Sequence, residues 1–84
     1  MSNKHPERVF RIGSVSASIF AREIATDHGR RTVRNVVLQR RYVDGEETRY
    51  TNGFGLAELS QIAACLEHAR RYVETREAEI DLGD

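Results

Sequence analysis

The sequence predicts an α+β fold, with three antiparallel strands, the first long and bulged, followed by one long C-terminal amphipathic helix. Asp44-Gly45 separates two segments rich in Val, Leu, Tyr and Thr. This is a strong hairpin signal, because both residues tolerate left-handed backbone angles. Gly55 and Glu58 have the spacing of a helix cap and its capping-box carboxylate. Phe54 and Leu59 have the spacing of a hydrophobic staple, so a helix is expected to begin here.

Residues 8–23 are predicted to form one long, bent strand. The apolar residues change alternation phase at Gly13-Ser14: Phe10 and Ile12 come before it, and Val15, Ala17 and Ile19 come after it. A phase slip of one residue at a glycine is typical of a β-bulge. We expect residues 1–7 to form a flexible tail, and residues 25–31 to form a polar, mobile connection.

The second and third strands are expected over residues 32–42 and 46–52. A three-residue loop with a glycine bulge would place Tyr50 opposite Leu38, whereas a two-residue loop would place Tyr50 opposite Gln39. The bulged register is favoured, because it collects the apolar groups on one face and leaves Arg41 and Arg49 together on the solvent face.

The helix is expected over residues 56 to about 77, with residues 77–84 as an acidic, frayed tail. Its apolar residues follow a 3,4,3,4 spacing, and flanking apolar residues widen the stripe to an arc of ~200°, well above the ≳100° that covers one sheet. The extra arc predicts a further partner, and we expect a homodimer formed through the helix. The predicted interface residues are Leu59, Ile62, Ala63, Cys65, Leu66, Ala69, Tyr72 and Val73.

The composition indicates one domain, over residues 8–76 of an 84-residue chain. A single cysteine, Cys65, excludes a disulfide within the chain and favours a reducing compartment. No apolar segment approaches the ~18 residues that span a bilayer. We therefore expect a cytoplasmic protein that is not inserted in a membrane.

Few residues are arranged for catalysis. Cys65 and His68 lie three apart on the predicted helix, but mid-helix and beside Glu67, which disfavours a reactive thiolate. The three histidines and the cysteine lack the spacing of a zinc site. Gly53-Phe54-Gly55 could offer amides to a phosphate but lacks the lysine of a P-loop. We expect no enzyme activity, no metal, no cofactor and no small-molecule substrate.

Charge is unevenly distributed although the formal net charge is zero. Residues 1–50 carry ten basic and six acidic groups, and residues 51–84 carry three basic and seven acidic groups. Basic surfaces interleaved with aromatic rings are typical of single-stranded nucleic-acid binding. The predicted contact residues are Phe20, Arg22, Arg34, Arg41 and Arg49. Two alternatives remain open: an ordinary solvated arginine surface, and a protein-interaction or accessory subunit that uses the apolar helix face.

The chain also resembles known proteins. In residue content and order it resembles a group of small uncharacterised bacterial proteins, through residues 11–20, 34–46 and 54–55 before a leucine-rich helix. In architecture it is similar to the single-stranded-DNA-binding transcriptional coactivators of the positive cofactor four type. That family has four strands and is richer in lysine. The similarity implies dimerisation through the helix and a curved sheet that meets single-stranded DNA.

Overall fold

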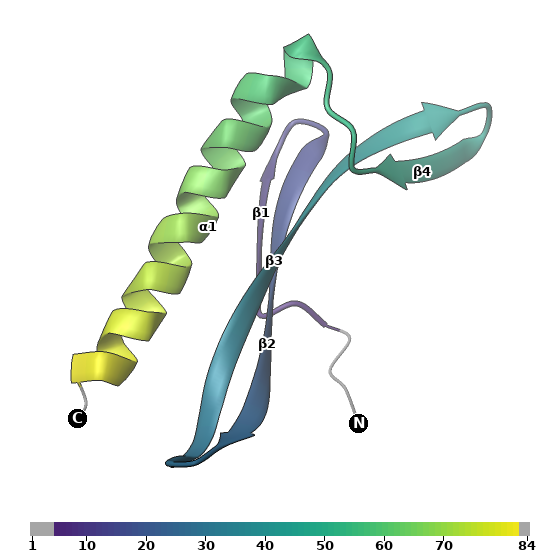
Figure 1. The fold of residues 1–84 in the computed structure, drawn as a ribbon. Helices are drawn as coiled ribbons and strands as arrows, with labels where there is room; N and C mark the ends of the chain where they lie inside the picture. Colours follow the sequence, from purple (N-terminus) through teal and green to yellow (C-terminus); the bar gives the residue numbers. More distant parts are fainter. Residues whose placement is uncertain (1–4, 83–84) are drawn as a thin grey trace.

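The computed structural model describes residues 5–82, which form four antiparallel strands followed by one helix (Figure 1). The elements are β1 (Arg8–Ile12), β2 (Val15–Thr26), β3 (Gly29–Asp44), β4 (Glu47–Thr51) and α1 (Leu56–Leu82). The strands lie in the order β1-β2-β3-β4, so each strand pairs with the next along the chain. The α+β class and the order of strands then helix are confirmed, but the sheet has four strands rather than three.

The fourth strand arises at Gly13-Ser14, where the predicted bulge is a hairpin turn. Gly13 has a φ of 60° and Ser14 a negative φ, which is the pattern of a two-residue type II′ turn. Ile12 lies opposite Val15 in the β1–β2 pair. Residues that face each other across a two-residue loop are an odd number apart in sequence, so a tight turn produces the same phase slip as a bulge.

The segment 25–31, expected to be a mobile connection, is the end of a second hairpin. β2 and β3 pair without interruption from Val15 opposite Arg40 to Thr26 opposite Gly29. The Thr26 hydroxyl donates to the Gly29 carbonyl at 2.7 Å and accepts the His28 N–H at 3.2 Å. These local hydrogen bonds hold residues 26–29 in a tight turn, whereas the polar sequence alone predicted a mobile connection.

The third hairpin has a register that differs from both of those considered. Its loop is Gly45-Glu46, and Gly45 has the expected left-handed φ, of 66°. Tyr50 consequently lies opposite Arg41, and Arg49 lies opposite Tyr42. Because adjacent residues of a strand point to opposite faces, Arg41 and Arg49 lie on different faces of the sheet.

The core lies between α1 and one face of the sheet, which we call the inner face. Its buried residues are Val15, Ala17 and Ile19 of β2 with Ile62, Cys65 and Ala69 of α1. The Cys65 Sγ lies 3.5 Å from the Phe10 carbonyl oxygen and 3.9 Å from that of Val15. The buried side of the helix is therefore centred on Cys65. Leu59 and Leu66, which belong to the predicted apolar stripe, are 49% and 46% exposed.

The helix begins where the sequence predicts and continues past the predicted end. The Glu58 carboxylate accepts the Gly55 N–H at 2.9 Å, as a capping box requires. α1 then continues to Leu82, so the helix includes most of the segment expected to be a frayed tail. Within the described part of the chain, no helix is both long enough and apolar enough to cross a membrane.

Candidate nucleic-acid interface

The second face of the sheet, which we call the outer face, is not covered by any element of residues 5–82, because α1 packs on the inner face (Figure 1). Strand alternation and the observed registers determine which residues it carries. In strand order these include Val9, Arg11, Ser16, Ser18, Phe20, Arg22, Val33, Asn35, Val37, Gln39, Arg41 and Tyr50.

Three arginines of the outer face, Arg11, Arg22 and Arg41, are exposed and come from three different strands. Within the described chain, none of the three forms an ion pair or a side-chain hydrogen bond, and no carboxylate occupies an outer-face strand position. The acidic residues of the paired strands, Glu23 and Asp44 among them, are at the alternate positions. The outer face therefore carries positive charge that no carboxylate of residues 5–82 neutralises by a direct ion pair.

Two aromatic rings accompany these arginines. Phe20 is half-buried on β2, two positions from Arg22 and therefore on the same face. Tyr50 is 58% exposed and lies opposite Arg41 across the β3–β4 pair. Sequence reasoning missed Tyr50 as a site residue because the bulged register placed it opposite Leu38. A two-residue loop formed by Gly45 and Glu46 would have placed Tyr50 opposite Arg41 and so identified it as a site residue.

Arg34 and Arg49, also predicted to contact nucleic acid, do not lie on the outer face. Arg34 points to the inner side, where its side chain is only 9% exposed. Its Nε and Nη2 atoms donate to the Glu7 carboxylate at 2.9 and 3.3 Å. Hydrogen bonds from Arg34 lower the pKa of Glu7, and the Tyr72 hydroxyl donates to the same carboxylate at 2.8 Å. Arg49 is paired with Asp44 and Glu47.

The segment 1–7, predicted to be a flexible tail, is attached to the folded domain at Glu7. Glu7 belongs to the segment 1–7, yet its backbone N–H donates to the Ile19 carbonyl at 2.6 Å. Arg34 also pairs with α1, since its Nη1 atom lies 3.8 Å from the Glu77 carboxylate. Residues 1–4 and 83–84 of the predicted tails lie outside the described residues.

The predicted interface residues of α1 separate into two groups. Ile62, Cys65 and Ala69 are buried beneath the sheet, and Tyr72 and Val73 are half-buried against the core. The remaining three, Leu59, Ala63 and Leu66, are exposed and lie with Leu56, which was not a predicted interface residue, in an exposed stripe on the helix. Any partner of the helix would meet the exposed stripe and not the buried residues.

Cys65 and His68 do not form a nucleophilic pair. The His68 ring stacks on Phe10, with centroids 5.5 Å apart, while the Cys65 thiol is buried against backbone carbonyls. Burial raises the pKa of that thiol, which disfavours the thiolate. Among residues 5–82, no three His, Cys, Asp or Glu side chains are close enough to share a metal ion.

Comparisons with protein-family models, with curated proteins and with solved structures found no match to this chain.

Proposed function

We propose that the protein is a small, non-enzymatic binding module that binds single-stranded nucleic acid across its outer face. The proposal depends on three arginines that have no carboxylate partner among the described residues, together with two accessible rings, on a sheet face that no described element covers. Phosphates require cations, and every base offers a face that can stack on an aromatic ring. Arg11, Arg22 and Arg41 would contact the backbone, and Phe20 and Tyr50 would stack with bases.

The architecture supports the same proposal more weakly. The single-stranded-DNA-binding coactivators to which the sequence is similar in architecture have four strands before their helix, and this chain also has four. A shared order of elements is compatible with many functions, so the proposal depends mainly on the outer-face residues.

The test is a titration of fluorescein-labelled oligothymidylate with the purified protein, followed by fluorescence anisotropy. Three phosphate contacts predict a slope of about −2.1 in log affinity against log salt, at about −0.7 per contact, so a fourfold rise in salt should weaken binding roughly twentyfold. Arg22→Gln combined with Arg41→Gln should flatten the slope by about 1.4 units.

The matched control is Arg49→Gln combined with Arg70→Gln. It removes the same charge, but from arginines that are paired with carboxylates away from the outer face. The control should leave the slope unchanged. In addition, Phe20→Ala should weaken binding by ~1–3 kcal/mol if its ring stacks a base. Salt-independent binding, or equal effects of the two double variants, would contradict the proposal.

We also propose that the chain forms a homodimer through the exposed stripe, because the monomer has an unusually large surface. Its accessible area is 6537 Å², compared with about 5,100 Å² for a typical monomer of 9.6 kDa. Its radius of gyration is 15.5 Å, compared with about 12 Å for a compact chain of this length. The excess of roughly 1,400 Å² exceeds the ~800 Å² per partner of a standard interface.

Light scattering on the eluate of a gel-filtration column, at micromolar protein, tests the dimer. The wild-type chain should have about twice the 9.6 kDa monomer mass. Leu59→Gln combined with Leu66→Gln should reduce it to the monomer mass, whereas Val43→Gln, which changes a 72% exposed valine in a hairpin, should not. A wild-type monomer would exclude the homodimer and leave the accessory-subunit alternative for the stripe.

A further inference from the structure

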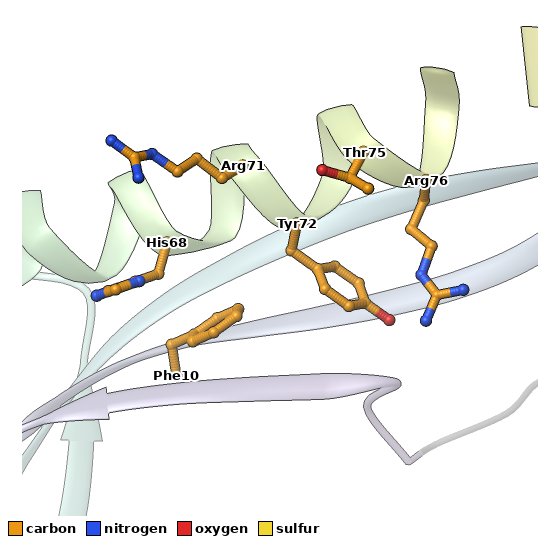
Figure 2. Close-up of a pocket in the computed structure, with 6 residues that line it drawn as sticks. All are labelled: Phe10, His68, Arg71, Tyr72, Thr75 and Arg76. Atoms are coloured by element: carbon orange, nitrogen blue, oxygen red, sulfur yellow. The ribbon is translucent and has the colours of Figure 1, made fainter. Parts of the chain in front are cut away.

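A second cationic surface lies on the inner side of the molecule, in the groove between β1 and α1. Rings and positively charged or ionisable groups alternate there in one continuous ladder. Arg76 lies over Tyr72 at 5.1 Å, Arg8 lies over Tyr72 at 5.9 Å and over Phe10 at 5.3 Å, and Phe10 stacks on His68 at 5.5 Å. Figure 2 shows Phe10 rising from β1 toward His68 and Tyr72, which descend from the helix.

The ladder borders an open pocket of about 450 Å³. Its lining residues are Phe10, His68, Arg71, Tyr72, Thr75 and Arg76 (Figure 2). The rings are already packed against one another and against guanidinium groups. What the pocket offers a ligand is therefore N–H and O–H donors, which suit an oxyanion better than a further flat ring.

The charge of this groove is largely uncompensated. Neither Arg8 nor Arg76 forms an ion pair with any residue that the structure describes, and both are held by ring contacts instead. The nearest carboxylate, that of Glu7, is engaged by Arg34 and by the Tyr72 hydroxyl. Guanidinium groups that stack on rings retain their in-plane donors for a carboxylate. Two positioned, unpaired arginines therefore face the groove.

The strand that forms the floor of the groove has a free edge. β1 pairs with β2 alone among the described strands. Residues that flank a two-residue hairpin loop form a hydrogen-bonded pair, so Ile12, Phe10 and Arg8 direct their backbone groups toward β2. The N–H and C=O groups of Val9 and Arg11 consequently point away from the sheet, where another strand could pair with them.

We propose that the groove binds an extended acidic peptide segment, which adds to the sheet as a strand beside β1. The outward backbone groups of Val9 and Arg11 would pair with its main chain. Alternate side chains would then point toward the inner side, so that Asp or Glu at every second position would bring carboxylates to Arg8 and Arg76. The site uses the backbone groups of Val9 and Arg11, whose side chains belong to the outer face, but its charged contacts come from Arg8 and Arg76, and it does not depend on nucleic-acid binding.

The test is an NMR titration of the ¹⁵N-labelled full chain with the end-capped peptide Thr-Val-Glu-Val-Glu-Val-Thr. Binding should shift the amide signals of Val9 and Arg11 and slow their hydrogen exchange. The same peptide with Gln in place of Glu should bind about tenfold or more weakly, because charge-assisted hydrogen bonds are lost. A peptide N-methylated at alternate amides should not bind, and this control leaves the protein unaltered.

Protein variants give an independent measurement. Arg8→Gln and Arg76→Gln should each weaken binding of the glutamate peptide about tenfold. Arg70→Gln is the matched control, because Arg70 lies on the same helix but is paired with Glu67 and Glu74. Absence of binding at millimolar peptide, or equal binding of the Glu and Gln peptides, would overturn the proposal. So would inorganic phosphate or a mononucleotide that fills the pocket while the peptide leaves Val9 and Arg11 unshifted.

Discussion

Replacement of Gly13 by alanine tests whether Gly13-Ser14 is a tight turn packed against the helix. Gly13 has a φ of 60°, which an alanine would adopt at a cost of about 1–2 kcal/mol. A Cβ atom at this position would also lie 2.6 Å from Nε2 and 3.0 Å from Cδ of Gln61 on α1. The Gln61 side chain would have to move, which adds about 1 kcal/mol for displaced packing. We expect a total loss of about 2–3 kcal/mol in the free energy of unfolding.

Gly45 provides the matched control. It has a similar φ of 66°, but nothing lies within 4 Å of its Cβ position. Gly45→Ala should therefore cost only the backbone strain of about 1–2 kcal/mol. Gln61→Ala should remove the excess cost of Gly13→Ala, so the double variant should show a favourable coupling of roughly 0.5–1 kcal/mol.

Urea unfolding at pH 7, followed by circular dichroism at one fixed protein concentration, measures these four variants beside the wild type. The fixed concentration matters because a dimer would make the midpoint depend on it. Equal costs for Gly13→Ala and Gly45→Ala, without coupling to Gln61, would refute the packed turn. A Gly13→Ala variant as stable as the wild type would instead support the predicted long strand with a bulge at Gly13-Ser14.

Three further predictions concern charge and the core. Arginine hydrogen bonds lower the pKa of Glu7, and they lower that of Glu67 to about 2. The stability that these carboxylates contribute is present above their ordinary value of 4.5 and lost as the pH falls toward 2. Urea midpoints should therefore decrease over that range, and less steeply in Glu7→Gln; an identical pH profile would contradict this. The buried Cys65 thiol should react with an aromatic disulfide reagent only as fast as the protein unfolds, and rapid stoichiometric labelling would contradict its burial. Cys65→Ser should lower the free energy of unfolding by about 1–3 kcal/mol in urea, because it places a hydroxyl in the core, and a neutral result would contradict that packing.

Local sequence signals determined much of the fold. The Gly55–Glu58 capping box placed the beginning of α1 correctly, because its hydrogen bond is made within one turn of the helix. Gly45 marked a real turn for the same reason, since its left-handed angle is a property of one residue. The apolar residues Val36 and Leu38 are two positions apart in β3, and both pack against the core on the inner face, as a period of two requires. In each case the decisive interaction spans only a few residues.

The tertiary structure decided what depends on contacts distant in sequence. A bulge and a tight turn at Gly13-Ser14 give the same alternation, and only the pairing of β1 with β2 distinguishes them. Arg34 was equivalent to the other arginines by sequence, until folding brought it to Glu7, 27 residues away. The favoured register placed Arg41 and Arg49 on one face, but in the observed register Tyr50 lies opposite Arg41 rather than Leu38. This shift of three residues, an odd number, separates the two arginines onto opposite faces, because strand side chains alternate with a period of two. The composition supplied the arginines, but pairing across strands determined which of them have no ion-pair partner among the described residues.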